Sequence, residues 1–273
     1  MSSENRRLLE VAVEAAGEAV AVHRRRLGTI GAEAWNTKGI ADFVTDVDLE
    51  AERRIVERVR AAYPDHGILA EEAASSEAGD DAGRSSDGWL WIIDPLDGTT
   101  NYLHRYPMYA ASVAVAREGE LVAGVVAAGA SDEVWTALRG EGAWRNGEPI
   151  RVSDTREMRK ALIGTGFPFK VPEEIPVYLE QLGRVFGRSA GVRRAGSAAM
   201  DLCHVASGWF DGFWELSLAP WDVAAGTLIV REAGGIVTRL DGQSDVIRTH
   251  GSLLAGNAAI HAALDEILIG DVP

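Results

Sequence analysis

The chain has 273 residues, of which 47% are hydrophobic and 25% charged, and its formal net charge is −14. This composition is typical of a globular protein that is long enough to bury a large core. A single cysteine excludes intramolecular disulfides and cysteine-based zinc clusters. The acidic balance argues against a nucleic-acid backbone as the main partner, and no apolar run is long enough to span a membrane. Because the first nine residues are polar and unlike a secretory signal, we expect a cytoplasmic protein.

In the first half of the chain, helical spacing of apolar residues predicts helices, and short apolar runs predict strands. In chain order we expect a helix over 4–27, a loop containing Lys38, a helix from Thr45 to about 63, strands over 67–70 and 89–93 with a mobile surface loop over 75–87 between them, two strands over 110–130, a strand over 133–139 and a hairpin turn at Asn146-Gly147.

The second half alternates helices with strands, which predicts layers of helices on a mixed sheet. In chain order we expect a helix over 174–186, a strand near Val192, a helix over 198–206, a strand around Phe213, a helix over 221–233, strands near Ile236 and Leu253, and a closing helix over 258–268.

The most informative segment is 94–101, which reads Asp-Pro-Leu-Asp-Gly-Thr-Thr-Asn and follows a predicted buried strand. Ligands of α/β proteins bind at the carboxyl ends of such strands. Asp94 and Asp97 could reach one hard cation together with the carbonyl oxygen of Leu96. Gly98 allows a tight turn, and the hydroxyls and amides after it could hold a phosphate. An acidic turn that closes a hairpin is the alternative, but the strand, the proline, the glycine and the two threonines together favour a cation site.

Three further acidic groups each have a plainer explanation. Glu71 and Glu72 end another predicted strand, where they could complete a metal site and orient a water, or simply begin a solvated loop. Asp46 and Asp48 follow a threonine and could be helix-capping residues. Asp222 lies at a predicted helix start, where acids are common, but it could also bring a carboxylate from the second half to a site between the halves.

These motifs resemble the inositol monophosphatase family, which belongs to the lithium-sensitive, metal-dependent phosphatases. The resemblance extends from about 38 to 257 and rests on WIIDPLDGTTN at 91–101, WDVAAG at 221–226, EAGG at 232–235 and the acidic motifs at 42–48 and 71–72. It implies an α+β fold, the layered αβαβα sandwich of the inositol monophosphatase and fructose-1,6-bisphosphatase type, usually assembled as a dimer. We accordingly expect a homodimer. We also expect an N-terminal α+β half (1–150) with most metal ligands and a C-terminal α/β half (151–273) with Asp222 and substrate-side residues, packed as one compact unit. Ala70 is a departure, since many members have glycine there.

The resemblance also implies roles for individual residues. The metal ligands for two or three Mg²⁺ ions would be Glu71, Asp94, Leu96, Asp97 and Asp222. The catalytic residues would be Glu71, Thr99, Asp48 and Asp94, in which Glu71 and Thr99 position the attacking water and Asp48 supports Thr99. The substrate-binding residues would be Gly98, Thr99, Thr100, Gly196, Ser197, Ala198, Glu215 and Asp222. Lys38 and Glu72 would support the catalytic loops.

The implied activity is Mg²⁺-dependent hydrolysis of a small phosphorylated polyol, with inositol monophosphate as the leading substrate, so the chain would be an inositol-phosphate phosphatase. Histidinol phosphate, or another sugar or nucleotide phosphate, remains open on the same fold. A non-catalytic metal- or phosphate-binding module is the alternative of another class. A haloacid-dehalogenase-type phosphatase fits less well, because two residues rather than one separate Asp94 from Asp97.

Overall fold

The computed structural model describes residues 3–29, 36–39, 42–76, 88–247 and 250–269, with the side chains of 36–39, 42–44 and 74–76 excepted. The first half contains α1 (Ser3–Arg26), β1 (Asn36–Gly39), β2 (Asp42–Val44), α2 (Asp46–Ala62), β3 (Gly67–Ala70), α3 (Glu71–Ser76), β4 (Trp89–Asp97), α4 (Thr99–Leu103), β5 (Ala110–Arg117), β6 (Glu120–Ala128), β7 (Val134–Leu138), β8 (Gly142–Arg145) and β9 (Glu148–Pro149). The second half contains β10 (Leu162–Thr165), α5 (Ile175–Phe186), β11 (Gly191–Arg193), α6 (Ala198–Ala206), β12 (Gly212–Leu218), α7 (Pro220–Glu232), β13 (Ile236–Thr238), β14 (Gly251–Gly256) and α8 (Ala258–Ile269), with short 3₁₀ turns at Met158–Lys160 and Pro172–Glu174.

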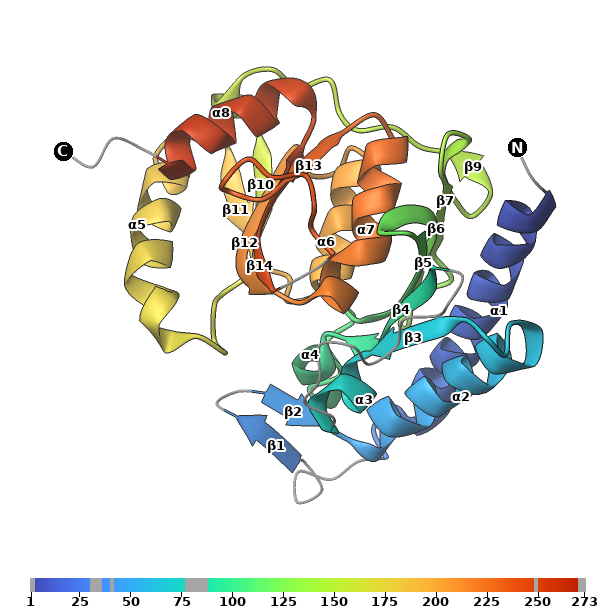
Figure 1. Cartoon of the computed structure of the whole chain (residues 1–273). Helices are drawn as coiled ribbons and strands as arrows, with labels where there is room; N and C mark the ends of the chain where they lie inside the picture. The colour runs from blue at the N-terminus through green and yellow to red at the C-terminus, as the bar shows by residue number, and fades with distance from the viewer. Residues whose placement is uncertain (1–2, 30–35, 40–41, 77–87, 248–249, 270–273) are drawn as a thin grey trace.

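Two large sheets and three helix pairs form five layers (Figure 1). A seven-stranded sheet with the order β3-β4-β5-β6-β7-β8-β9 lies between the α1–α2 pair and the α6–α7 pair. A five-stranded sheet with the order β11-β10-β12-β14-β13 follows, and α5 and α8 cover its outer face. This arrangement confirms the predicted αβαβα sandwich.

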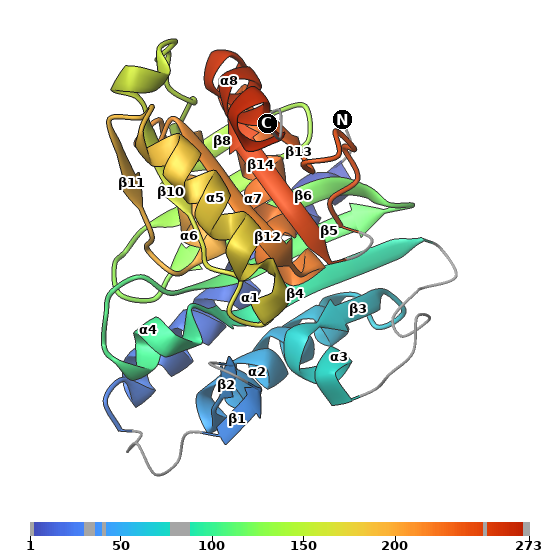
Figure 2. The same cartoon turned by 90° about the vertical axis from the view of Figure 1, so that its left-hand side faces the viewer.

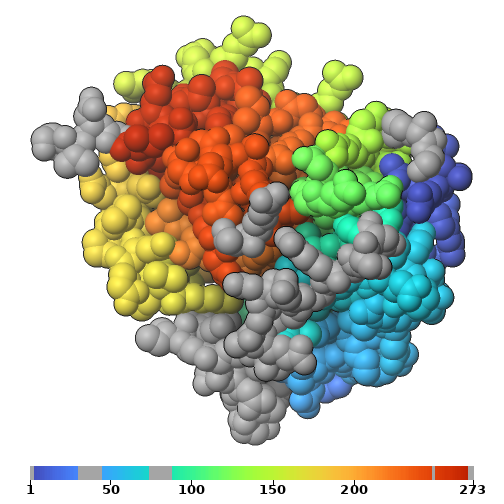
Figure 3. All heavy atoms as spheres, in the orientation of Figure 1, coloured from blue at the N-terminus to red at the C-terminus, as the bar shows by residue number. Residues whose placement is uncertain are grey.

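The burial pattern of β4 explains why its sequence is almost continuously apolar. Trp91 and Ile93 pack in the core beneath α1 and α2, whereas Ile92 packs on the opposite face in the core beneath α6 and α7. Successive side chains of a strand point to opposite faces, so a strand that is covered on both faces needs apolar residues at every position. Helix α1 contributes to the first of these cores, whereas α8 packs in a third core with α5. On the face in Figure 3 the first and second halves of the chain lie against each other.

Several local predictions need correction. Lys38, expected in a loop, lies in β1, which pairs with β2 as a small separate sheet close to α2 (Figure 2). The strand that begins at Trp89 continues to Asp97, with a bulge in its pairing with β5. The short helix α4 and the strand β10 were not predicted.

The hairpin prediction is confirmed, because Arg145 pairs with Glu148 around Asn146 and Gly147, whose φ angles are 51° and 82°. Most of the loop predicted over 75–87 lies outside the described residues. Within the described chain, no helix has the length and hydropathy to cross a membrane.

Candidate active site

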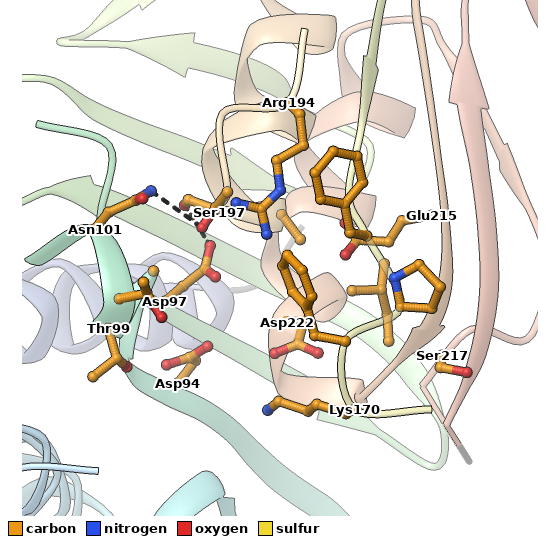
Figure 4. Close-up of a pocket in the computed structure, with 18 of the residues that line it drawn as sticks. Asp94, Asp97, Thr99, Asn101, Lys170, Arg194, Ser197, Glu215, Ser217 and Asp222 are labelled. Atoms are coloured by element: carbon orange, nitrogen blue, oxygen red, sulfur yellow. Dashed lines mark hydrogen bonds between the residues drawn. The ribbon is translucent and has the colours of Figure 1, made fainter. Parts of the chain in front are cut away.

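A cavity of about 280 Å³ opens where the carboxyl end of β4 faces the starts of α6 and α7 and the end of β12 (Figure 4). It draws its walls from both halves of the chain. Its lining includes the predicted site residues Glu71, Asp94, Leu96, Asp97, Gly98, Thr99, Thr100, Gly196, Ser197, Ala198, Glu215 and Asp222.

Strand register brings the first two acids together. β3 runs parallel to β4 with Ala70 opposite Ile93, so the next residues, Glu71 and Asp94, come side by side where the strands lead into the cavity. The bulge that follows in β4 then carries Asp97 to the same cavity. Residues that are far apart in sequence therefore converge because parallel strands end at one edge.

Gly98 turns the chain sharply from β4 into α4. Its φ of +89° is a left-handed conformation that favours glycine, and a Cβ there would lie 2.7 Å from the carbonyl oxygen of Met108. The tight turn predicted at Gly98 is therefore present, and Thr99 after it lines the cavity.

Thr99 is held by an acid from α2. Its hydroxyl lies 3.0 Å from Asp48 Oδ1 and 3.1 Å from the carbonyl oxygen of Leu96, both of which can accept its proton. The other oxygen of Asp48 accepts the backbone N–H of Thr45 at 2.9 Å and its hydroxyl at 2.6 Å. Burial raises the pKa of Asp48 to about 6, although these hydrogen bonds oppose the shift. Asp48 is thus a capping residue of α2 and also a hydrogen-bond partner of Thr99, and its role in catalysis stays a prediction.

Asp97 links β4 to the start of α6. Its Oδ2 accepts the Ser197 hydroxyl at 2.5 Å and the Ala199 N–H at 2.8 Å. Ser197 is also the N-cap of α6, accepting the Met200 N–H at 3.3 Å. Burial and the nearby Asp222 raise the pKa of Asp97 to about 7.

Asp222 comes from the second half of the chain and begins α7. Its Oδ2 accepts the backbone N–H of Ala219 at 2.7 Å, so the predicted helix-start role is present. Its carboxylate also lines the cavity and acts electrostatically on Asp94. Burial, together with the negative charges of Glu71, Asp97 and Asp222, raises the pKa of Asp94 well above its usual value.

The donor chemistry of this cluster fits Mg²⁺. Four carboxylates and the Leu96 carbonyl are hard oxygen ligands, and the raised pKa values show that the acids repel one another. Across the described residues, however, no three acids, histidines or cysteines approach one another as closely as the ligands of one ion. A physical reason is that Asp94, Asp97 and Asp222 each direct one oxygen to a backbone N–H. The donor chemistry therefore fits a magnesium site, although the acids lie farther apart here than the ligands of one bound ion do.

The substrate side of the cavity contains Glu215 from β12. Burial and the charges of Asp201 and Asp222 raise its pKa well above the usual value, and Arg194 opposes the shift. Gly196, with a φ of +90°, precedes Ser197 in the loop between β11 and α6. These positions agree with the predicted substrate-side residues, whose roles stay predictions.

Sequence reasoning missed one wall of the cavity, formed by Phe167, Pro168, Phe169, Lys170 and Ser217. Arg194 also lies in this wall: its guanidinium carbon is 4.8 Å from the Phe167 ring centre and 4.9 Å from that of Phe169. The Phe-Pro-Phe sequence at 167–169 could have indicated a binding wall. Because β10 was not predicted, however, nothing in the sequence placed this segment next to the acids.

Of the two predicted support residues, Glu72 is described and is not part of the cavity lining. The Lys38 side chain lies outside the described residues. Glu72 is buried in the first turn of α3, where its backbone N–H donates to Glu52 Oε2 at 2.8 Å. The roles proposed for both residues therefore stay predictions.

The comparisons with known proteins agree with this geometry. The model of the inositol monophosphatase family matches residues 4–272. The chain is 44% identical over 266 residues to the inositol-1-monophosphatase of Rhizobium meliloti, covering 97% of each chain. It is 42% identical over 264 residues to a putative Nus factor SuhB of Neisseria meningitidis serogroup B, covering 97% of this chain and 98% of the relative.

Among solved structures, the inositol monophosphatase of Anabaena superposes with a TM-score of 0.84 at 38% identity, covering 98% of this chain and 97% of that one. The family match, the identities and the shared fold extend over nearly the whole length of the chain. The chain therefore belongs to the inositol monophosphatase family and is a phosphatase of that type.

Proposed function

We propose that this protein hydrolyses small phosphate monoesters with Mg²⁺, and that inositol monophosphate is its leading substrate. The observation that carries the proposal is the convergence of acids from both halves on one cavity, beside a threonine hydroxyl held by a buried aspartate. Gathering these acids costs stability because their charges repel one another, and bound divalent cations would relieve that repulsion.

In this proposal Glu71, Asp94, Asp97, Asp222 and the Leu96 carbonyl would hold two or three Mg²⁺ ions. Bound Mg²⁺ supplies positive charge that offsets the phosphate and lowers the pKa of a nearby water. Glu71 and the Thr99 hydroxyl orient the attacking water, and Asp48 fixes the direction of that hydroxyl. The backbone amides of Gly98 and Thr99 face the phosphate oxygens.

On the alcohol side, Glu215 accepts hydrogen bonds from substrate hydroxyls, and the loop of Gly196, Ser197 and Ala198 borders the same space. Histidinol phosphate remains an alternative, since a carboxylate can also pair with an amine. We further propose a homodimer, and a division into halves at 1–150 and 151–273.

The name of the Neisseria relative supports a second candidate, a role as a Nus factor. The acidic net charge alone does not exclude that role. A non-catalytic module that binds metal or phosphate with the same acids is a third possibility.

The test is phosphate release from purified protein on myo-inositol 1-phosphate and histidinol phosphate, with and without Mg²⁺, and with lithium added to active samples. Mg²⁺-dependent, lithium-inhibited turnover that favours inositol phosphate is the expected result. Preference for histidinol phosphate would change the substrate but keep the chemistry. Absence of turnover on any monoester would refute the phosphatase proposal and leave the Nus-factor or binding role.

A further inference from the structure

Gly166 lies directly beside the Glu215 carboxylate. β10 runs parallel to β12 with Thr165 opposite Trp214, so the residues that follow them, Gly166 and Glu215, are neighbours at the cavity end of these strands. A Cβ built on Gly166 would overlap the carboxyl carbon and both carboxylate oxygens of Glu215. The carboxylate of Glu215 thus occupies the space that a side chain at position 166 would fill.

The backbone does not require glycine at this position. Gly98 and Gly196 have positive φ angles, but Gly166 is not among the glycines with that conformation. A residue such as alanine could therefore adopt the backbone of Gly166 without strain. What the position requires is the absence of a side chain.

A buried aromatic cluster packs on the other face of these two strands, opposite the Glu215 carboxylate. The Thr165 hydroxyl lies 3.2 Å from the hydroxyl of Tyr178, whose ring stacks on Trp214 at 6.0 Å and meets Phe167 edge-on at 5.5 Å. Tyr178 and Trp214 are fully buried in the core beneath α5 and α8. This close-packed cluster holds the two strands in place, so a side chain added at Gly166 would displace the flexible Glu215 carboxylate rather than the backbone.

We propose that Gly166 is a specificity-determining residue: because it has no side chain, the Glu215 carboxylate can occupy its present place in the cavity wall, where it would meet the hydroxyls of a polyol carrying the phosphate. The inference rests on the proposed function, in which Glu215 accepts hydrogen bonds from substrate hydroxyls. It names the substrate class as an alcohol with hydroxyls beyond the phosphorylated carbon. Gly166 touches no substrate itself and acts through the position of Glu215.

The experiment is a double-mutant cycle of Gly166→Ala with Glu215→Ala. KM and kcat are measured at saturating Mg²⁺ for myo-inositol 1-phosphate and for ethyl phosphate, whose alcohol has no further hydroxyl. We expect Gly166→Ala to lower kcat/KM for inositol phosphate by about tenfold or more, mainly through KM, and to affect ethyl phosphate much less. In the Glu215→Ala background the same change should cost less than about twofold, because no carboxylate remains to be displaced. Glu215→Asp, whose side chain is one methylene shorter, should partly rescue Gly166→Ala.

Gly164→Ala is the matched control, because it lies two residues earlier in β10 and its Cβ would meet the Phe210 ring at 2.8 Å rather than Glu215. It should lower the melting temperature without coupling to Glu215. If Gly166→Ala folds poorly, the double variant should recover the melting temperature of Glu215→Ala. If the effects of Gly166→Ala and Glu215→Ala on kcat/KM are independent, or if Gly166→Ala lowers kcat/KM equally for both esters, this inference is overturned while the proposed function stands. No turnover of either ester by the unaltered protein would overturn the proposed function and this inference with it.

Discussion

Replacing Asp48 by asparagine separates its capping role from its role toward Thr99. The amide oxygen can still accept the Thr45 N–H and hydroxyl, whose distances from Asp48 Oδ2 are 2.9 and 2.6 Å. The amide nitrogen then faces the Thr99 hydroxyl, which Asp48 now accepts at 3.0 Å. Because an amide NH₂ only donates, Thr99 must become the acceptor and turn its proton toward the Leu96 carbonyl, 3.1 Å away.

The expected effect on stability is small. The pKa of Asp48 is raised from 3.8 to about 6, so its ionisation costs the folded state on the order of 3 kcal/mol at neutral pH. The neutral amide avoids that cost and can still accept the two bonds from Thr45. Because the raised pKa is already net of the hydrogen bonds from Thr45 and Thr99, we expect Asp48→Asn to leave the protein at least as stable as before. Asp48→Ala leaves the buried Thr45 donors unsatisfied and should lower the free energy of unfolding by about 2–4 kcal/mol.

Asp48→Asn should lower turnover strongly although it does not destabilise the fold. If Asp48 directs the Thr99 hydroxyl, kcat should fall by roughly 10- to 100-fold at saturating Mg²⁺, since each 1.4 kcal/mol of the barrier is about tenfold in rate. Urea unfolding and phosphate release are measured on the same preparations. A stable Asp48→Asn protein with kcat within about twofold of the original would refute the reasoning and leave Asp48 as a helix cap only.

Three further outcomes follow from the same geometry. Ser197→Ala removes the 2.5 Å bond to Asp97 and the α6 cap, so unfolding free energy should fall by about 1–2 kcal/mol and a Mg²⁺ titration of activity should show a weaker midpoint; an unchanged midpoint would contradict this. Without Mg²⁺, the pKa of Asp97 is raised from 3.8 to about 7, so the folded state binds its proton more tightly than the unfolded state does. The resulting stabilisation is complete below pH 3.8 and is lost as the pH rises through 7. Melting temperatures in EDTA should therefore be lower at pH 8 than at pH 5.5, and Mg²⁺ should raise them more at pH 8; the opposite order would count against the acid cluster. Asp94→Asn should reduce turnover by orders of magnitude even at saturating Mg²⁺, and near-normal turnover would remove Asp94 from the site.

Site residues could be predicted from the sequence where acidic residues follow directly after a predicted buried strand. Asp94 and Asp97 could be predicted because a buried strand ends in acids, and Glu71 because a second strand does the same. The short helix α4 was missed because five residues leave no periodic pattern, and its start depends on the left-handed turn at Gly98. The local signals predicted layers of helices on a mixed sheet, whereas the five-layer αβαβα order came from the family resemblance.

The aromatic wall could not be predicted for a different reason. Phe167 and Phe169 reach the cavity only because β10 pairs with β12 and because Tyr178 supports Phe167 from α5. Those contacts join segments that have no common local pattern. Likewise, the importance of Gly166 depends on which residue of β12 lies next to it, and strand register is not encoded in either segment alone.

The coincidence of helix caps and candidate ligands has an electrostatic cause. α6 and α7 begin at the cavity, and α2 begins next to Thr99, which lines it. Ser197 is the N-cap of α6, and Asp48 and Asp222 lie in the first turns of α2 and α7. Helix N-termini carry partial positive charge, so they stabilise acids that would otherwise repel one another before cations bind. Each acid therefore resembles an ordinary cap in the sequence even when it serves the site, and substitution by alanine removes both roles together. Only an isosteric amide keeps the cap and removes the charge, so loss of activity without loss of stability in such variants distinguishes an acid of the site from an acid of the helix.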